Sequence, residues 1–509
     1  MKRFLTILLT TLLLTAALCV TASASDYDAV AEDLSAIGMF RGTANGFELD
    51  RAPTRSEAAI MLVRLYGAED SAKTAYEAGE IKHPFTDVSA TAAPYVAWLY
   101  TNGIANGTTA ATFGSASKCS VQNYAVFLLR ALGYKDGTDF QYADALAFAQ
   151  SKGFYEPLMF SGDFLRDDLA ALTYQALAAD MADGKTYLLD SLIQSGAIDA
   201  KAAAPMTEKI TAYRSMEAAM DGMDEDAMDV DIDMNMDMTM DGTKVPSKTT
   251  GSMQMIVDGK DIQLACTMKT SAMGETMDIG MWMKDGWLYM SMNDGAEATS
   301  VKYPVEDQTA ALEGLQIVDV EGMDVSGLAM LDSLTAEKSG GDTVYTLVIS
   351  DGMGGLMDTI TGMLGEETSG MSLDIGKITA AYTVGSNGKL KSIAVAFSAS
   401  MKMDIPGEDG QTVSTDVAYD YDMTMKVNAM GSGVKITYPD FSKFQEIDPN
   451  NPGDNTAVPD SEASQRTIYV TKTGKHYHYD NNCNGGTYYE STLEAALRQG
   501  LTPCEKCVA

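Results

Sequence analysis

The segment from His83 to Tyr134 constrains this chain more than any other, because it has the pattern of one complete helix-loop-helix unit. The pattern predicts a first helix at Pro94 to Tyr100, a glycine-rich loop at Gly107 to Gly114 and a second helix at Val121 to Leu132. The second helix carries one apolar stripe at positions i, i+3, i+4 and i+7, formed by Tyr124, Phe127, Leu128 and Ala131. A unit of this size cannot bury such a stripe alone, so the sequence predicts sister repeats.

Two further segments repeat the helical phase of this unit. Upstream, Leu49 to Gly67 has Thr54 as a helix N-cap and Glu57 as its capping-box partner. Downstream, Asp163 to Leu177 has apolar residues at the same helical spacing. Residues 25–200 are therefore expected to form three all-α repeats of one design.

These repeats resemble the S-layer homology family. Phe85 to Val88 give the family's FxDV start, and Thr54-Arg55-Ser56-Glu57 nearly match its Thr-Arg-Ala-Glu helix start. The resemblance implies docking on bacterial cell-wall polysaccharide, because in the family this Arg lines grooves for an anionic, often pyruvylated glycan, and a guanidinium suits a carboxylate. The Arg is kept here as Arg55 and Arg166, which are the expected glycan-binding residues. The alternative is that both only cap or pair locally.

The N-terminus and the net charge predict an exported protein. Residues 1–24 combine Lys2 and Arg3, an apolar run and the small-residue motif Ala22-Ser23-Ala24, which is typical of a secretory signal peptide. No later stretch approaches the about 18 consecutive apolar residues of a transmembrane span. The formal net charge of -35 argues against a nucleic-acid partner, because phosphate binding needs clustered Lys and Arg. We therefore expect a secreted protein of the cell wall or S-layer surface.

Residues 205–447 are expected to form a methionine-rich, mainly antiparallel β domain with inserted helices. From Met228 to Met240, apolar residues alternate strictly with polar ones, most of them Asp, which is typical of a half-buried strand. Further strands are expected at Ser252–Val257, Ile262–Lys269, Met277–Met283, Trp287–Met292, Thr343–Ile349, Lys377–Val384, Leu390–Met403 and Ser414–Met425. Helices are expected near Gln308–Leu315, Leu328–Ala336 and Leu356–Leu364.

This layout resembles the secreted lipoprotein carriers of the LolA and LppX type, in which a curved, half-barrel-like sheet and helices enclose an apolar cavity. The resemblance lies in the opening amphipathic strand, the turn within Lys284 to Met292 and the closing segment Val434 to Ile447. It implies a lipid or another apolar small molecule as ligand, and flexible Met side chains suit such a face. A dry structural core and Cu(I) held by thioethers are alternatives. The Asp face of the opening strand could bind Ca²⁺, but the simpler interpretation is a solvated face that resists edge-to-edge aggregation.

The histidine content limits catalysis. The chain has only three His, at His83, His476 and His478, so Ser-His-Asp or Cys-His catalysis is excluded in the middle domain. We therefore expect that the protein is not an enzyme. The alternative is a wall-associated glycan hydrolase that uses paired carboxylates.

Residues 448–466 have the composition of a linker, and residues 467–509 carry a pattern of metal ligands. His478 and Cys483 follow an expected strand at Ile468 to Thr471, and Cys504 and Cys507 form a C-x-x-C motif after an expected helix at Thr492 to Gln499. Four nitrogen and sulfur ligands in two pairs suit a tetrahedral structural Zn²⁺. Three Cys cannot all pair as disulfides within the module, which also favours a metal.

The module resembles the small zinc module, related to the metal-binding domain of Ada, at the C-terminus of many secreted bacterial nucleases and surface proteins. Tyr469 to His478 match its pattern nearly residue for residue. His476 stands where the family usually has Lys, so the resemblance implies that it is a bystander. With four protein ligands no position remains for a catalytic water, and the module is expected to be structural or adhesive.

Overall fold

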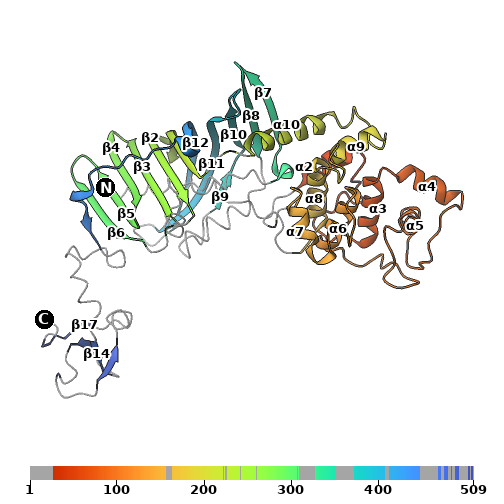
Figure 1. Ribbon diagram of the computed structural model, residues 1–509, viewed down its shortest axis with the longest axis horizontal. Coiled ribbons are helices and arrows are strands. Elements are labelled where there is room, and N and C mark those ends of the chain that lie inside the picture. Colours follow the sequence, from red (N-terminus) through yellow and green to blue (C-terminus); the bar gives the residue numbers. More distant parts are fainter. Residues whose placement is uncertain are drawn as a thin grey trace.

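The computed structural model describes most of the chain from residue 27 to residue 507 (Figure 1). The residues described are 27–155, 157, 163–221, 223, 226–240, 242–259, 261–305, 308, 327–349, 372–406, 412–447, 468–471, 475–479, 483, 488–491, 502–504 and 506–507. The expected signal peptide and linker lie outside them. So do the expected helices at Leu356–Leu364 and Thr492–Gln499, and the one at Gln308–Leu315 after its first residue.

The N-terminal region is helical, and its second repeat has the predicted elements. The capping box of Thr54 and Glu57 is confirmed, since each side chain accepts a hydrogen bond from the other residue's backbone N–H. The predicted apolar stripe on α6 is buried. The helices are α2 (Asp28–Ala36), α3 (Arg55–Leu65), α4 (Glu69–Glu77), α5 (Ala93–Thr101), α6 (Val121–Ala131), η1 (Tyr142–Asp144), α7 (Ala145–Gln150), α8 (Arg166–Ala178) and α9 (Leu188–Gln194).

The start of α3 packs on the loop of the next repeat. The backbone N–H of Arg55 donates to the carbonyl of Ser117 at 2.8 Å, and that of Ser56 donates to the carbonyl of Ser115 at 3.2 Å. Two of the N–H groups that a helix start leaves without helical partners are thus satisfied by a distant loop.

The start of α8 packs on the loop of the first repeat in the same way. The N–H of Arg166 donates to the carbonyl of Arg51 at 2.9 Å, and the N–H of Asp167 donates to that of Leu49 at 3.2 Å. The first and third repeats therefore use equivalent helix-start residues against equivalent loops. This shared geometry supports the prediction of repeats of one design.

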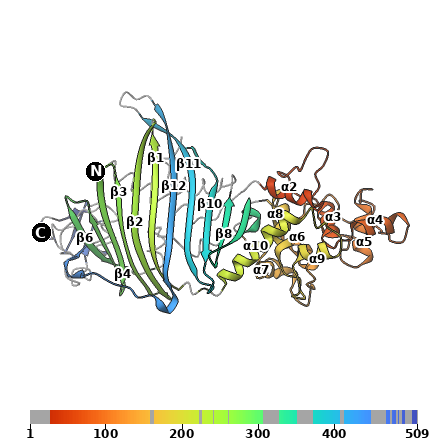
Figure 2. The same cartoon turned by 90° about the horizontal axis from the view of Figure 1, so that it is seen from above.

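The middle region forms an open thirteen-stranded sheet (Figure 2). The strand order is β13-β6-β5-β4-β3-β2-β1-β12-β11-β10-β8-β7, with β9 beside β11. Only the β13–β6 pairing among these is parallel, so the predicted antiparallel sheet is confirmed. The strands are β1 (Ala227–Met240), β2 (Thr243–Asp258), β3 (Asp261–Ala272), β4 (Glu275–Lys284), β5 (Trp287–Asn293), β6 (Ala298–Pro304), β7 (Ser333–Ser339), β8 (Asp342–Ile349), β9 (Ser372–Ile375), β10 (Ile378–Val384), β11 (Leu390–Pro406), β12 (Thr412–Met430) and β13 (Gln445–Glu446).

Strand β1 has the alternation that its sequence predicts. Met228, Met234 and Met236 are buried, whereas Asp231 and Asp233 on the opposite face are exposed. The strand lies in the centre of the sheet between β2 and β12 over nearly its whole length. A one-residue slip would turn the whole Asp row inward, so burial of the Met face fixes the register.

Two expectations about secondary structure need correction. The helix expected at Leu328–Ala336 is instead a short 3-10 turn, η4 (Leu328–Met330), followed by strand β7. Leu334 lies opposite Leu347 of β8, so a long-range ladder outweighs the local helical spacing. In addition, the β domain expected from residue 205 is preceded by a helix, α10 (Ala204–Met220), which packs against β7.

The closing segment Val434 to Ile447 crosses the outer face of the sheet. Phe441 stacks on Tyr289 of β5 with ring centroids 3.7 Å apart, and it meets the edge of Trp282 at 6.0 Å. The hydroxyl of Tyr438 donates to the carbonyl of Met283 at 3.2 Å. This face is the one opposite the methionines, so the segment covers aromatic side chains on the outward side.

The C-terminal region forms a small four-stranded sheet of order β16-β14-β15-β17. The strand expected at Ile468–Thr471 is confirmed as β14 (Ile468–Val470). The other strands are β15 (His476–His478), β16 (Tyr489–Ser491) and β17 (Thr502–Pro503).

Candidate functional site

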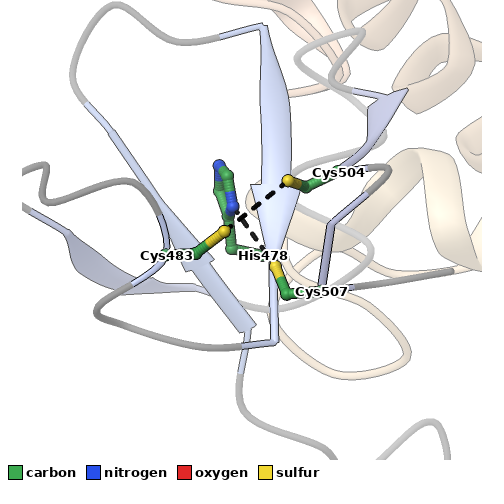
Figure 3. A group of neighbouring side chains, drawn as sticks. All are labelled: His478, Cys483, Cys504 and Cys507. Atoms are coloured by element: carbon green, nitrogen blue, oxygen red, sulfur yellow. Dashed lines mark hydrogen bonds between the residues drawn. The ribbon is translucent and has the colours of Figure 1, made fainter.

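Four side chains of the C-terminal sheet point toward one another (Figure 3). One ligand atom from each of His478, Cys483, Cys504 and Cys507 lies within 4.8 Å of the others. The sulfurs of Cys483 and Cys504 are 3.8 Å apart, and the Cys507 sulfur is 3.4 Å from Nδ1 of His478. The first three residues are buried, and Cys507 is half-buried. The cluster could hold a metal ion.

Strand pairing explains how residues 29 positions apart meet. Tyr477 of β15 pairs with Pro503 of β17, and the N–H of Cys504 donates to the carbonyl of Tyr477 at 3.0 Å. Cys504 is therefore beside His478, which follows Tyr477. A tight turn, in which the N–H of Cys507 donates to the carbonyl of Cys504 at 3.2 Å, returns the last ligand to the same point.

The thiols of this cluster are electrostatically unlike. Burial, together with the neighbouring Cys507 and Cys504 thiols, raises the pKa of Cys483 to about 12. The N–H of Lys506 donates to Cys504 and lowers the pKa of that thiol. Three crowded sulfurs cannot all carry negative charge without a cation, and a bound metal removes this conflict because it deprotonates coordinating thiols.

His476 lies apart from the four residues of the cluster. It is exposed, and its Nδ1 is 2.7 Å from the hydroxyl of Thr502. Because side chains alternate along a strand, His476 and His478 share one face of β15 while Tyr477 occupies the other. The contact with Thr502 keeps the ring of His476 outside the cluster although the two histidines share a face.

A second candidate site lies where the loop of the second repeat meets the start of α3. The carboxylate of Asp87 accepts hydrogen bonds from the N–H groups of Phe113, Gly114 and Ser115 at 2.7, 2.8 and 2.9 Å. These bonds lower the pKa of Asp87, the N–H of Ser115 contributing most. The Asp of the FxDV start therefore fixes the loop against α3.

Arg55 extends over this loop. Its Nη2 donates to the carbonyl of Asn106 at 2.9 Å, and its guanidinium lies 4.8 Å from the ring centroid of Phe113. Burial lowers the pKa of Arg55, although a guanidinium stays charged at any physiological pH. The residue is half-buried, so part of its surface remains open.

Three polar atoms at this junction stand out within the described part of the chain. Nε of Arg55, Oγ of Ser56 and Oγ of Ser115 are buried, and none has a hydrogen-bond partner among the described residues. The backbone N–H of Ser56 donates to the carbonyl of Ser115, so these two residues are neighbours at the junction. Buried polar atoms are nearly always paired, with protein or with solvent, so this group needs outside partners.

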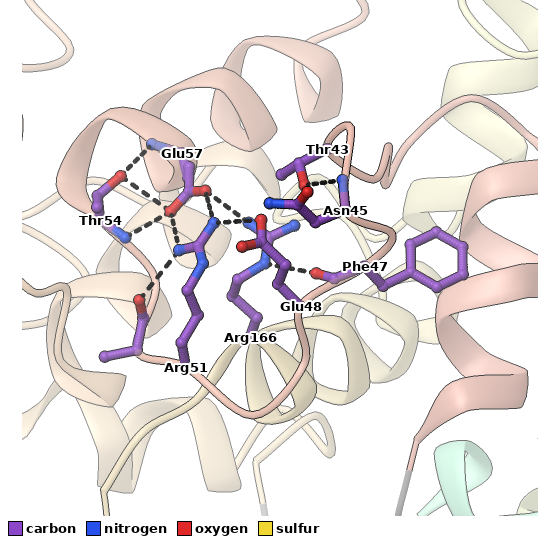
Figure 4. A network of polar contacts seen from close by, with 9 residues as sticks. Thr43, Asn45, Phe47, Glu48, Arg51, Thr54, Glu57 and Arg166 are labelled. Carbon is purple, nitrogen blue, oxygen red and sulfur yellow. Dashed lines mark hydrogen bonds and ion pairs between the residues drawn. The ribbon is translucent and has the colours of Figure 1, made fainter.

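Arg166, the other expected glycan ligand, is placed differently (Figure 4). It is 4% exposed, and its guanidinium lies 4.9 Å from the ring centroid of Phe40. Its Nε donates to the carbonyl of Phe47 at 2.8 Å, and its Nη1 donates to Glu57 at 2.8 Å. Arg51 also binds Glu57, at 2.6 Å. The surroundings of Arg166 are thus filled by the protein itself.

The second repeat lacks an Arg at the equivalent place on α6. Ser120 caps the helix by accepting from the N–H of Asn123, and the side-chain amide of Gln122 donates to the carbonyl of Tyr142 at 2.6 Å. The sequence did not single out Asp87, Ser56 and Ser115 as site residues. The FxDV and helix-start motifs contain the first two, but only the fold brings Ser115 to them.

Comparisons with known proteins support the resemblance of the second repeat to the S-layer homology family. Residues 84–114, which contain Asp87 and its loop, match the S-layer homology domain. None of the curated proteins matches the chain. Among solved structures, a DUF1329 family protein from Desulfovibrio piger aligns at 11% identity over 45% of this chain and 95% of that one, with a TM-score of 0.15. A likeness this weak carries no argument about the sheet.

No helix within the described ranges is long and apolar enough to cross a membrane. The S-layer homology match covers Asp87 and most of the loop that its carboxylate binds. This match indicates a cell-surface protein with a wall-anchoring segment.

Proposed function

We propose that this protein is secreted and docks non-covalently on bacterial cell-wall polysaccharide through the junction at Arg55, where the start of α3 meets the loop of the second repeat. The observation that carries the proposal is the group of three buried, unpartnered polar atoms on Arg55, Ser56 and Ser115. A glycan that carries a carboxylate offers acceptors of the kind that these donors need, because a guanidinium and hydroxyls can donate to its oxygens. The match of residues 84–114 to the S-layer homology domain supports the same function.

We assign the docking role to Arg55 more than to Arg166. Arg55 is half-buried beside atoms that lack partners, whereas Arg166 is 4% exposed and bonded to Glu57 and Phe47. Arg166 then supports the fold on which the junction at Arg55 rests. Glycan binding by Arg166 would require these bonds to break, and breaking a buried ion pair costs about 3–5 kcal/mol.

The C-terminal cluster is proposed to hold one structural Zn²⁺. One imidazole and three thiolates at mutual distances within 4.8 Å form a set that suits tetrahedral coordination. The residues 467–509 are too few to bury a sufficient core, and a metal compensates for that. The set is complete with four protein ligands, so the site has a structural role in this proposal.

The methionine face of the sheet is proposed to receive a lipid or another apolar ligand. Its support is the row of buried Met, Val and Ile side chains on the two central strands, among them Met234, Met236, Met423 and Met425. Thioether side chains adapt to varied apolar shapes. A glycan hydrolase would instead need two carboxylates facing across a cleft. The cross-strand pair Asp237 and Asp420 lies on the outward face of the sheet, which does not favour that alternative.

The docking proposal is tested by co-sedimentation of the mature protein with sacculi that keep their secondary polysaccharide. The wild-type protein should sediment, and Arg55→Ala should weaken binding about tenfold, a loss of about 1.4 kcal/mol. Arg41→Ala is the control, because Arg41 is exposed and its partner Glu69 keeps Arg64, Lys73 and Tyr95 as partners. Wild-type protein that stays in the supernatant, or equal binding of both variants, contradicts the proposal.

A further inference from the structure

A cavity of about 660 Å³ lies where the helical region meets the sheet. Its wall combines Asp33 of α2, Tyr174 of α8, one side of α10, and residues 332–336 at the start of β7. Both ribbon views place these elements together (Figures 1 and 2). The volume lies within the range of about 300–1,000 Å³ for small-molecule sites, which occur preferentially at such junctions.

Lys209 of α10 places a buried ammonium group in this wall. The residue is 9% exposed, and its Nζ donates to the carbonyl of Leu331 and lies 4.8 Å from the ring centroid of Tyr174. An ammonium group has three donors. Among the described residues one carbonyl accepts from the ammonium and the ring of Tyr174 lies against it, so a donor direction remains for an oxygen that comes from outside. A buried charge with so few partners is costly unless something else completes them.

The carboxylates in the same wall, those of Asp33, Glu208 and Asp332, need hydrogen-bond donors instead. Two of them have protein partners. Asp33 accepts from the hydroxyl of Tyr174 at 3.1 Å, and Asp332 lies 3.9 Å from the ammonium of Lys377. Both are exposed, so each has capacity for further donors. Burial lowers the pKa of Lys209 to about 8, while the charges of Asp33 and Asp332 act in the other direction. The cavity therefore contains charges of both signs.

These charges restrict the ligand class. An anion in the cavity would face Asp33 and Asp332, and a cation would face Lys209. A neutral polyol avoids both conflicts, because each hydroxyl can accept from the ammonium or donate to a carboxylate. Thr211, Ser215 and Ser333 add hydroxyl groups to the wall.

We propose that this cavity binds a neutral polyhydroxylated ligand of the saccharide class, held between Lys209, Asp33 and Asp332. The site shares no residue with the docking junction at Arg55. It is therefore a second carbohydrate site, at the junction between the helical region and the sheet.

The test uses the mature full-length protein and saturation-transfer NMR with N-acetylglucosamine and cellobiose as neutral probes. Glucuronate and glucosamine serve as the anionic and cationic probes. At least one neutral saccharide should bind, and it should bind several-fold more tightly than either charged probe. Lys209→Met should weaken its binding at least tenfold. Lys201→Met is the matched control, because Lys201 is exposed just before α10, and it should bind like the wild type.

Three results overturn the proposal: no binding of either neutral saccharide, equal or tighter binding of a charged probe, or unchanged binding by Lys209→Met. Circular dichroism checks that this variant is folded. If it is not, Asp332→Asn takes its place and should also weaken binding, and unchanged binding then counts against the site. Arg55→Ala should keep saccharide binding at this site, so failure here is separable from failure of wall docking.

Discussion

Arg166 and Glu57 form an ion pair at 2.8 Å although 109 positions separate them in the chain. The pair joins the first turn of α8 to the first turn of α3, and Arg51 binds the same carboxylate from the loop before α3. The carboxylate also completes the capping box of α3. A single side chain thus links the cap of one repeat to the helix start of another.

Arg166→Met should destabilise the helical region by about 3–5 kcal/mol. The substitution keeps the apolar contact with Phe40 but removes the charge that Glu57 needs, and breaking a buried pair from one side is costly. Urea unfolding followed by far-UV circular dichroism measures the change. Lys185→Met should have little effect, because Lys185 is exposed and forms only a surface pair with Asp183. Equal stability of the two variants would show that the pair is dispensable.

Acid should destabilise the same region through Glu57 and Glu69. Burial acts to raise both pKa values, but hydrogen bonds from Arg51 and Thr54 hold Glu57 at about 2, and those from Lys73 and Tyr95 hold Glu69 at about 2. A carboxyl whose pKa is lower in the folded protein stabilises it above the unfolded value of 4.5. That stability is lost as the pH falls from 4.5 toward 2.

Thermal unfolding at a series of pH values checks this expectation. The wild-type melting temperature should fall steeply between pH 4.5 and pH 2. The melting temperature of Glu69→Gln should fall less steeply, because one of the two protonation sites is gone. The variant should be less stable than the wild type at neutral pH, where Arg64 and Tyr95 lose their charged partner. Parallel curves for the two proteins would assign the acid sensitivity to other groups.

The sequence was sufficient to predict those features of the structure that depend on residues close together in the chain. Thr54 and Glu57 are three positions apart, and their capping box could be predicted from that spacing. Strict alternation from Met228 predicted β1, because burial of one face leaves a single register. The four residues of the Cys/His cluster could also be proposed from their spacing, since few residue types bind soft metals.

Features that depend on distant residues could not be predicted in the same way. The segment Leu328–Ala336 was expected to be a helix, but the ladder between β7 and β8 decides its conformation. Arg166 follows the family motif, yet its burial depends on Phe40, Phe47 and Glu57 from another repeat. Helix α10 was missed because the domain boundary was drawn from methionine content, which begins at Met206 inside the helix.

A rise in pH above 8 should increase the contribution of Lys209, at the junction of the helical region and the sheet, to the free energy of unfolding. Burial lowers the pKa of Lys209 to about 8 in the folded protein, compared with 10.5 for an ordinary lysine. The unfolded chain then binds more protons between pH 8 and pH 10.5, so the contribution of Lys209 to stability rises across that interval. Below pH 8 the cost of burying the charge is fully present. The free energy of unfolding of the wild type minus that of Lys209→Met should therefore increase from pH 8 to pH 10. A constant difference would place the Lys209 pKa near its ordinary value.

Removal of metal should unfold the C-terminal module and leave the rest of the chain folded. The ligands must be deprotonated and the module has little core, so metal affinity is folding free energy, on the order of 10 kcal/mol at neutral pH. Metal analysis of the purified protein should give one Zn²⁺ per chain. X-ray absorption should show one nitrogen and three sulfur ligands at about 2.0 and 2.3 Å.

Limited proteolysis with and without a chelator distinguishes the module from the other regions. Chelation should expose residues 467–509 to cleavage while the helical and sheet regions stay resistant. Cys504→Ser should reproduce this effect, because the cluster loses a buried thiolate that lies 3.8 Å from Cys483. His476→Ala is the control and should keep its zinc, because His476 is exposed and lies beside Thr502 outside the four-residue cluster. A native disulfide between Cys504 and Cys507, or a refolded module without zinc, would refute the assignment.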